Sequence, residues 1–328
     1  MTTAIIITTI NPPTKTVLEI CRQGKADLIV IGDNKSPDGW ECPGATYFDV
    51  DRQREVMPQI ADILPYNHYC RKNLGYLFAV RDGAEIIVDT DDDNIPNDDW
   101  YIPKQSGEFD TVSSGKGFVN AYSAFTDQHI WPRGLPLQDV LSPNADLRGS
   151  SFKKKLHNVG VWQGLANGDP DVDAIYRLVI NKPCTFEKRD PLVLDEGVVC
   201  PYNSQNTITY KEFFPLLYLP CFVNFRFTDI LRGLIGQVIL WDHGARLGFF
   251  EATVFQDRNE HDFFKDFVDE DPCYRYPYDV IDVVKSSIRS GASVADQLID
   301  AYRSLSRNGI VDQDKELPVL EPWLSELT

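Results

Sequence analysis

The sequence lacks the features that mark membrane, nucleic-acid-binding and secreted proteins. No segment reaches the roughly eighteen consecutive apolar residues that a membrane-spanning helix requires. The longest basic cluster is three lysines, at residues 153 to 155, in a chain of net charge −17, which argues against nucleic acid as the main partner and against a polybasic membrane anchor. The first ten residues have neither the charged region nor the long apolar stretch of a signal peptide, and they predict a β-strand instead.

Paired cysteines are missing as well. The seven cysteines are an odd number without a Cys-x-x-Cys pair, a pattern that indicates reduced thiols and predicts a cytoplasmic location. Internal repeats and low-complexity linkers are also absent from the sequence. Because 43% of the 328 residues are hydrophobic and 25% are charged, the chain can bury a sizeable core, and one large domain or one and a half is expected.

The first part of the sequence alternates between predicted strands and helices. Strands are expected at residues 4 to 10, 27 to 32 and 86 to 88, and helices at residues 14 to 23 and about 67 to 82. This alternation predicts an α/β fold with a mixed, mostly parallel sheet flanked by helices. Ligands of such sheets bind beyond the carboxyl ends of the strands, where Thr8, Thr9 and Asp33 would meet the acids that follow residue 88.

The second part of the sequence is more mixed. Its patterns predict strands at residues 207 to 210 and 248 to 254, a helix at 230 to 241, polar helical structure from 280 to 307 and a proline-containing tail from 312 to 328. We therefore expect a catalytic domain at residues 1 to 275 and a C-terminal helical extension with its tail at residues 276 to 328.

The most informative segment is a short apolar run that ends in acids, at residues 84 to 96. On a strand, alternate side chains share a face, so Asp89, Asp91 and Asp93 are predicted on one side and Asp92 on the other. Carboxylates this close repel one another unless a cation or a proton relieves the charge. Oxygen ligands suit Mg²⁺ or Mn²⁺, which would in turn hold a substrate diphosphate, as in the Asp-x-Asp motif of nucleotide-sugar glycosyltransferases.

The acidic segment has two other interpretations, a calcium-binding loop and a solvated loop. An EF-hand calcium loop would use acids at positions one, three and five, but it also needs Gly at six and Glu at twelve, where this chain has Asn94 and Trp100. A solvated acidic loop is common in a chain with this net charge. The apolar strand before the acids and Pro96 after them favour a metal site.

A series of short segments keeps an order that is known from one family. In chain order they are Cys70-Arg71-Lys72-Asn73-Leu74-Gly75-Tyr76-Leu77, Asp91-Asp92-Asp93, Trp131-Pro132-Arg133-Gly134-Leu135-Pro136-Leu137, Gly160-Val161-Trp162, Asp169-Pro170-Asp171-Val172-Asp173-Ala174, Arg226-Phe227-Thr228-Asp229-Ile230 and Trp241-Asp242-His243-Gly244. Together they resemble the reversibly glycosylated polypeptides, also called UDP-arabinopyranose mutases, and the related STELLO glycosyltransferase-like proteins. The resemblance implies a GT-A-type fold that binds a nucleotide sugar through a divalent cation.

One departure from this family pattern separates its two branches. In the mutases, the arginine that becomes glycosylated follows the Arg-Gly-x-Pro-Phe segment by three residues, and here that position is Val140. The departure places mutase chemistry in doubt. A transferase closer to the STELLO-like branch is therefore the preferred interpretation.

Candidate donor-binding residues follow from the segments and from the predicted strand ends. Arg71 and Lys72 could reach donor phosphates, although surface cations on an amphipathic helix are an alternative. Asp33 could accept from a uracil or ribose group, with a turn-forming Asp as the alternative. The predicted donor set is completed by Thr8, Thr9, Asp92 and Arg133.

Asp229 is the candidate for the acceptor side, together with Arg226. In an inverting transferase, a carboxylate removes the proton of the acceptor hydroxyl while the metal stabilises the leaving diphosphate. An acid in the first turn of a helix is equally explained as an N-terminal cap. A further metal ligand is expected near the end of the catalytic domain, where the mutases carry a Trp-His pair and this chain has Gln256-Asp257. Asp257 and His261 are the candidates.

The sequence therefore predicts a metal-dependent glycosyltransferase. Its expected partners are a nucleotide-sugar donor, for which a UDP-sugar is the expectation, and a glycan or other hydroxylated acceptor, with homo-oligomer formation as a further expectation. Two alternatives stay open: a UDP-sugar mutase, and a noncatalytic nucleotide-sugar-binding scaffold subunit of a glycan-assembly complex.

Overall fold

The computed structural model describes residues 1 to 257 and 262 to 327, and it confirms the predicted α/β class. Its strands are β1 (Thr3–Thr8), β2 (Asp27–Ile31), β3 (Ala45–Phe48), β4 (Ile86–Thr90), β5 (Asn94–Pro96), β6 (Ser106–Val112), β7 (Gly117–Phe118), β8 (Lys153–Gly168), β9 (Leu192–Leu194), β10 (Val198–Val199), β11 (Asn206–Tyr210) and β12 (Ala245–Gln256). Its α-helices are α1 (Lys15–Gln23), α2 (Val50–Val56), α3 (Pro58–Ile63), α4 (Lys72–Arg81), α5 (Ala174–Val179), α6 (Thr228–Asp242), α7 (Phe263–Asp269), α8 (Asp271–Arg275), α9 (Pro277–Ser287), α10 (Val294–Arg307) and α11 (Gln313–Ser325).

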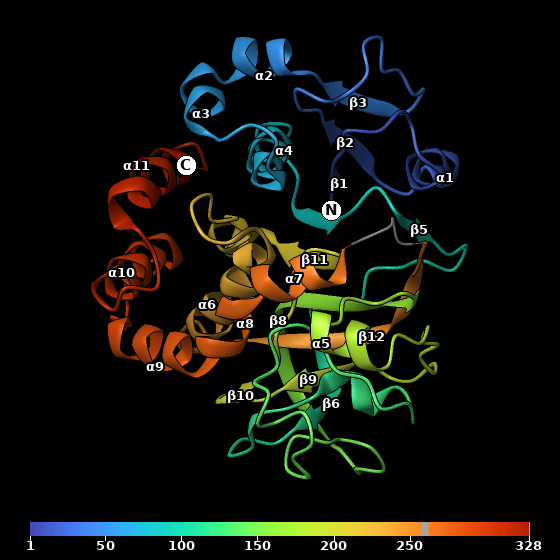
Figure 1. Cartoon of the computed structure of the whole chain (residues 1–328), viewed down its shortest axis with the longest axis vertical. Coiled ribbons are helices and arrows are strands. Elements are labelled where there is room, and N and C mark those ends of the chain that lie inside the picture. The colour runs from blue at the N-terminus through green and yellow to red at the C-terminus, as the bar shows by residue number, and fades with distance from the viewer. Residues whose placement is uncertain (258–261, 328) are drawn as a thin grey trace.

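A ten-stranded sheet forms the centre of the molecule, in the order β3-β2-β1-β4-β11-β8-β6-β9-β12-β5 (Figure 1). The N-terminal strands β3, β2, β1 and β4 are parallel, as the alternation of strands and helices predicted. Beyond β4 the sheet is mixed, because β11 runs antiparallel to both β4 and β8. The parallel arrangement therefore covers β3, β2, β1 and β4, and the rest of the sheet is mixed.

Local signals explain the parallel half. Helix α1 begins where predicted because the Thr14 side chain accepts a hydrogen bond from the Val17 amide, and it ends at Gly24 in a left-handed conformation. Helix α4 lies against β1 and β2, and Gly75 permits this close approach because a Cβ there would lie 2.4 Å from Ile6 Cγ2. The carboxyl ends of β1, β2 and β4 consequently open on the same edge of the sheet.

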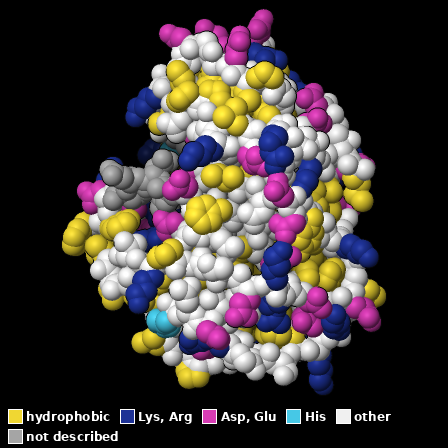
Figure 2. Space-filling model, turned by 90° about the vertical axis from the view of Figure 1, so that its right-hand side faces the viewer, with side chains coloured by type: hydrophobic (Ala, Val, Ile, Leu, Met, Phe, Trp, Pro, Cys, Tyr) yellow, Lys and Arg dark blue, Asp and Glu magenta, His cyan; other side chains and the backbone are white. Residues whose placement is uncertain are grey.

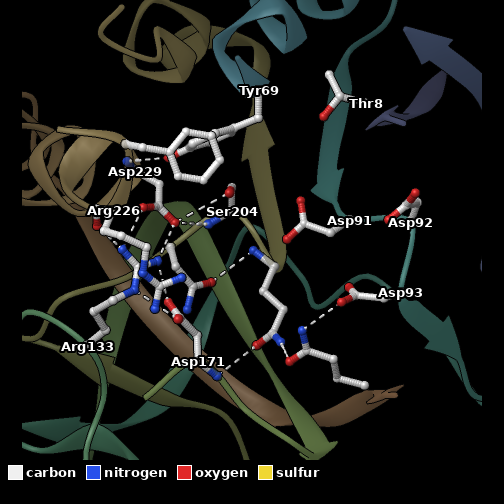
Figure 3. A pocket seen from close by; sticks show the side chains of 14 residues that line it. Thr8, Tyr69, Asp91, Asp92, Asp93, Arg133, Asp171, Ser204, Arg226 and Asp229 are labelled. Atoms are coloured by element: carbon white, nitrogen blue, oxygen red, sulfur yellow. Dashed lines mark hydrogen bonds and ion pairs between the residues drawn. The ribbon is translucent and has the colours of Figure 1, made fainter. Parts of the chain in front are cut away.

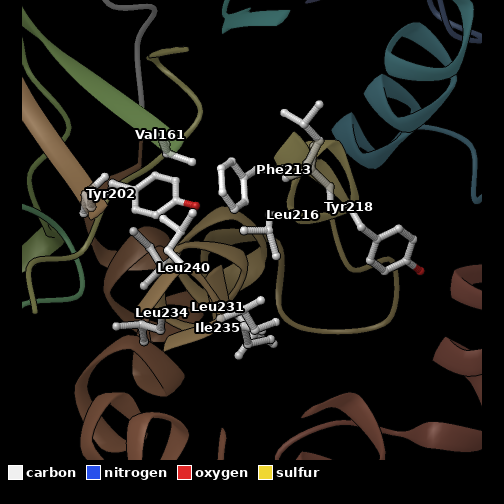
Figure 4. Close-up of a cluster of buried hydrophobic side chains, with 14 of the residues drawn as sticks. Val161, Tyr202, Phe213, Leu216, Tyr218, Leu231, Leu234, Ile235 and Leu240 are labelled. Atoms are coloured by element: carbon white, nitrogen blue, oxygen red, sulfur yellow. The ribbon is translucent and has the colours of Figure 1, made fainter. Parts of the chain in front are cut away.

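Helix α6 lies at the centre of the main hydrophobic core. It is buried along most of its length. The core combines side chains of α6 with side chains from the sheet and from the 3₁₀ segment η3 (Lys211–Leu217) (Figure 4). Among the labelled members of this core are Val161, Phe213, Leu231 and Leu240. The tight packing fixes the first turn of α6, which lies at the functional site.

The C-terminal helices α9, α10 and α11 follow one side of the molecule (Figure 1). They share the main core, in which Val280, Leu298 and Trp323 are buried. The expected proline-containing tail is wrong, since α11 continues through Pro318 and Pro322 and is anchored by the Trp323 indole, which donates to the Asn73 carbonyl at 2.9 Å.

Charges of both signs are interspersed on the surface. On the face in Figure 2, Lys and Arg side chains lie among Asp and Glu side chains despite the acidic total. Within residues 1 to 257 and 262 to 327, no helix combines the length and apolarity needed to cross a membrane.

Candidate functional site

Two adjoining cavities open at the carboxyl edge of the parallel strands. The first, of about 270 Å³, is here called the acidic cavity and is lined by Thr8, Tyr69, Asp91, Asp92, Asp93, Arg133, Asp171, Asn203, Ser204, Gln205, Phe225, Arg226, Asp229 and Gln256. The second, of about 400 Å³, is called the β1–β2 cavity and is lined by Thr8, Thr9, Ile10, Asn11, Ile31, Gly32, Asp33, Lys35, Asn67, His68, Tyr69, Arg71, Asp92 and Phe225. The two share Thr8, Tyr69, Asp92 and Phe225, so they are neighbours with a common wall.

The acidic segment lies at the junction of these cavities, but its geometry differs from that of an extended strand. Strand β4 ends at Thr90 and a turn follows, so strict alternation of side chains stops there. Asp91 and Asp93 both line the acidic cavity, as predicted (Figure 3). Asp92 also lines the cavities, where Thr9 Oγ1 donates to its carboxylate at 2.5 Å and Asn11 Nδ2 does so at 3.0 Å.

Asp89 and Lys72 lie beneath this turn and have structural partners. The Asp89 side chain is fully buried and accepts from Lys72 Nζ at 2.9 Å, from the Tyr76 hydroxyl at 2.7 Å and from Arg232 Nη1 at 2.7 Å. The geometry therefore corrects Asp89 from a metal ligand to a buried ion-pair partner. It also corrects Lys72 from a phosphate ligand, because its ammonium donates to Asp89, to the Thr90 carbonyl and to Asp91.

Asp91 is the acid whose environment is most perturbed. Its carboxylate accepts from Lys72 Nζ at 2.9 Å, and 41% of its side chain is exposed in the cavity. Desolvation, together with the charges of Asp93 and Asp89 and against the opposing effect of Lys72, raises the pKa of Asp91 to about 7. Solvent in the open cavity moderates this shift. A carboxyl group under such repulsion is a favourable place for a cation.

Arg133 occupies the opposite wall of the acidic cavity, between two carboxylates (Figure 3). Its Nε and Nη2 donate to Asp171 at 2.9 and 2.8 Å, and its Nη1 and Nη2 donate to Asp229 at 3.1 and 3.0 Å. The fifth N–H donor is directed to the Arg226 carbonyl. Arg133 therefore holds the two carboxylates in place, which differs from the predicted contact with the donor.

Asp229 lies in the first turn of α6, yet it is more than a helix cap. Its Oδ2 also accepts from the Ser204 amide at 3.3 Å, and its own amide donates to the Tyr69 hydroxyl at 3.1 Å. A helix cap would accept from the amides two or three residues further along the helix. The Asp229 carboxylate instead accepts from the amide of the next residue, Ile230. The carboxylate is thus a buried partner of Arg133 at the cavity wall.

Arg226 lines the same wall and is held from behind. Its Nε and Nη2 donate to Glu270 Oε1 at 3.0 and 2.5 Å. The other oxygen of the buried Glu270 accepts from the Ala174 amide and from the Tyr274 hydroxyl. This network joins η4 (Phe225–Phe227) to α5 and to the segment between α7 and α8.

A chain of amide side chains joins the two walls of the acidic cavity. The Asp171 amide donates to Gln205 Oε1 at 3.3 Å, Gln205 Nε2 donates to Gln256 Oε1, and Gln256 Nε2 donates to Asp93 at 3.2 Å. Gln256 therefore reaches the cavity at the position where sequence reasoning expected Asp257. Asp257 lines a separate hollow of about 210 Å³ beside Asp92 and Asp93.

The metal-ligating residues can be stated for the described part of the chain. No group of three His, Cys, Asp or Glu side chains within residues 1 to 257 and 262 to 327 is arranged to hold a metal ion. His261, the other predicted ligand, lies outside the described residues. Asp91, Asp92 and Asp93 are the carboxylates that the β4–β5 turn contributes to the lining of the acidic cavity, and Asp92 already accepts from Thr9 and Asn11.

The β1–β2 cavity contains the other predicted donor residues. Asp33 lines it, with its oxygens accepting from the Asn34 amide at 2.7 Å and the His68 amide at 3.3 Å. Arg71 lines it too, but its guanidinium donates to Gln53 Oε1 and to the Ala61 and Leu64 carbonyls. Desolvation lowers the pKa of this arginine. Arg71 is therefore committed to holding α2 and α3 against α4, which corrects its predicted role as a phosphate ligand.

Several cavity residues were missed from the sequence: Tyr69, Asp171, Asn203, Ser204, Gln205, Phe225 and Gln256. Asp171 lies in Asp169-Pro170-Asp171, one of the segments that carry the family resemblance, so the sequence could have identified it as a candidate. The other residues come from loops and strand ends whose proximity depends on the fold. The aromatic pair Tyr69 and Phe225, in edge contact at 4.7 Å between ring centroids, lies where the two cavities meet.

Comparison with known proteins places this geometry in context. No protein-family model matches the chain. It is similar to the probable glycosyltransferase STELLO2 of Arabidopsis thaliana, with 31% identity over 288 residues, covering 80% of this chain and 37% of that protein. It is similar to the probable glycosyltransferase STELLO1 of the same plant, with 30% identity over 282 residues, covering 78% and 36%. The chain spans little more than a third of the length of these relatives, and the similarity supports the STELLO-like branch of the predicted resemblance.

Proposed function

We propose that this chain transfers a sugar from a nucleotide-sugar donor to a hydroxyl acceptor with the help of a divalent cation. The observation that carries the proposal is the position of Asp91 and Asp93, which line the acidic cavity just after a buried strand, on either side of Asp92, which lines both cavities. The similarity to two probable glycosyltransferases supports the same reaction class. A UDP-sugar is the proposed donor.

The donor is proposed to extend across both cavities. Its nucleoside would lie in the β1–β2 cavity, where Asp33 offers a carboxylate to a base or ribose group. Its diphosphate would lie at the junction, near Asp91, and its sugar would project into the acidic cavity beside Tyr69 and Phe225, because aromatic faces pack well on apolar faces of ligands. The ends of parallel strands at a change in strand order are the usual place for such ligands.

The residues at the junction fit a magnesium or manganese ion. These ions favour oxygen ligands and are commonly held by one or two carboxylates together with substrate phosphates, without a complete protein cage. Asp91 and Asp93 supply two such carboxylates, which agrees with the lack of a three-ligand group among the described residues. When bound, the cation would neutralise charge that develops on the leaving diphosphate.

The opposite wall is proposed to handle the acceptor. Asp229 would accept the proton of the attacking hydroxyl, and Arg133 would hold the carboxylate in place. Asp171, the second carboxylate on Arg133, also lines the cavity and is the alternative base. Comparing Asp229→Asn with Asp171→Asn distinguishes these two roles.

Binding of UDP with and without Mn²⁺ tests the donor site directly. In isothermal calorimetry, the wild-type chain should bind UDP more tightly with Mn²⁺, and Asp91→Asn and Asp93→Asn should lose this metal-dependent gain while remaining folded. Asp98→Asn is a matched control, because that side chain is 90% exposed on the following connection. Unchanged UDP affinity with Mn²⁺ in both cavity variants would refute the proposed site.

A catalytic assay separates transfer from binding alone. A glycosyltransferase is expected to release UDP slowly from its donor by hydrolysis in the presence of Mn²⁺, and a noncatalytic scaffold subunit is not.

The mutase alternative is disfavoured by the position of Val140, because this side chain packs against the hydrophobic core and lines neither cavity. We therefore place the reaction on an external acceptor.

A further inference from the structure

We propose that Lys72 is a built-in counter-ion that makes cation binding at Asp91 depend on the diphosphate of the donor. The inference rests on the proposed nucleotide-sugar site and concerns how that site is filled. Lys72 is the first residue of α4, and its side chain is completely buried beneath the acidic turn. It therefore belongs to the protein side of the site and is inaccessible to the donor.

The ammonium group of Lys72 is fixed in place. It has three N–H donors, and they are directed to Asp89 Oδ1 at 2.9 Å, to the Thr90 carbonyl at 2.8 Å and to Asp91 Oδ1 at 2.9 Å. A buried lysine with all donors used has little freedom to withdraw when another cation approaches. The positive charge next to Asp91 is thus a permanent part of the site.

The charges around the turn show which acid Lys72 serves. Asp89 already has a cation of its own, because Arg232 Nη1 donates to its Oδ2 at 2.7 Å. Arg232 and Asp89 are both buried, and they form a neutral pair that also includes the Tyr76 hydroxyl. Lys72 donates to the other oxygen of Asp89 and also forms an ion pair with Asp91. Removing Lys72 would leave the Asp89–Arg232 pair intact and Asp91 without this cation.

This arrangement weakens the binding of a divalent cation that arrives without the nucleotide. A cation that binds Asp91 must share the carboxylate with a fixed ammonium, and the two positive charges repel each other. A diphosphate carries negative charge and supplies further oxygen ligands, so it offsets the repulsion and completes the coordination. The cation should therefore bind weakly alone and tightly with the nucleotide. By thermodynamic linkage, the nucleotide gains the same factor from the cation.

Manganese binding followed by electron paramagnetic resonance of free Mn²⁺ tests this coupling. In the wild-type chain, saturating UDP should tighten Mn²⁺ binding by about 10-fold or more, the usual range for coupled sites. Lys72→Met should raise the affinity for Mn²⁺ without UDP by about 10-fold and reduce the gain from UDP by a similar factor. Lys72→Gln removes the charge but keeps amide donors near Asp89 and Asp91, and it should behave like Lys72→Met.

The control is Lys25→Met, which removes a lysine whose ammonium donates to the Asp98 and Trp100 carbonyls, away from Asp91. It should leave Mn²⁺ binding unchanged and so exclude a general effect of net charge. Folded Lys72→Met and Lys72→Gln variants that keep both the wild-type affinity for Mn²⁺ and the wild-type gain from UDP would overturn the inference, while the donor site itself would stand. Failure of the wild-type chain to bind Mn²⁺ even with UDP would instead refute the proposed function.

Discussion

Replacing Asp229 by Asn changes the buried charge balance of the acidic cavity while keeping the size of the side chain. In the wild-type chain, both oxygens of Asp229 accept from Arg133, and Oδ2 also accepts from the Ser204 amide. An Asn side chain replaces one of these oxygens with an NH₂ group, which then faces an N–H donor. Arg133 would be left with Asp171 as its remaining carboxylate partner in this pair of contacts.

The magnitude follows from the burial of the pair. The Arg133 and Asp229 side chains are each 6% exposed, and breaking an ion pair that is buried to this extent costs about 3–5 kcal/mol. Because Asp171 still pairs with Arg133, we expect the lower part of that range, about 3 kcal/mol. A simple helix cap predicts almost no loss, since Asn and Asp are equivalent at that position.

Denaturant titration measures this loss, and single-turnover kinetics measures the chemistry. If Asp229 is also the base, turnover at a temperature where the variant is folded should fall by about 10²-fold or more, while UDP affinity with Mn²⁺ stays near wild type. Asp296→Asn is the control, because Asp296 lies in the first turn of α10 at the surface and should change stability by less than about 0.5 kcal/mol. An Asp229→Asn variant as stable as the wild type would refute the ion-pair argument, and normal turnover would assign Asp229 to structure.

Three further predictions concern stability and self-modification. Burial raises the pKa of Asp173 to about 6 from its usual 3.8, so the contribution of this group to the free energy of unfolding should fall as the pH rises from about 4 to 6, and in denaturant titrations the stability of Asp173→Asn relative to the wild type should increase over that range. Gly75→Ala should destabilise the fold by about 1–3 kcal/mol despite a better helix propensity, because the new Cβ meets Ile6 at 2.4 Å and Ile31 at 3.0 Å, and thermal unfolding measures this. Incubation with labelled UDP-sugars should leave the intact mass unchanged, because Val140 stands where the mutases are glycosylated, and a stoichiometric sugar adduct would contradict this.

The parts of the fold that the sequence predicts well are those with local causes. Helix α1 carries its own start signal at Thr14 and its own stop at Gly24, and the apolar run before Asp89 identifies β4. The carboxyl-end rule for parallel strands then placed Thr8 and Asp33 at the site. Each of these inferences needs only neighbouring residues or a general rule of sheet topology.

The predictions that were wrong concern residues whose environment depends on where a strand ends or on contacts with distant parts of the chain. Alternation predicted that Asp89 and Asp91 share one environment, but β4 ends at Thr90, which leaves one acid in the core and the other in the cavity. The two prolines of α11 predict an irregular tail, because proline disfavours a helix interior, yet tertiary packing around Trp323 stabilises the helix. Burial of a distant side chain supplies free energy that no local pattern records.

Cations in this site were misassigned for the same reason. Lys72 and Arg71 were predicted as phosphate ligands because their type suits phosphates, and Arg133 as a donor-binding residue, but each is committed to protein acceptors. A buried cation with its donors satisfied cannot turn to a ligand without breaking those bonds, and its effect on the ligand is exerted through the carboxylates that it holds. Lys72 therefore acts from behind the acids. The acidic cavity presents Asp91 and Asp93 on one wall and, on the other, the ion-paired set of Arg133, Asp171 and Asp229 beside Arg226.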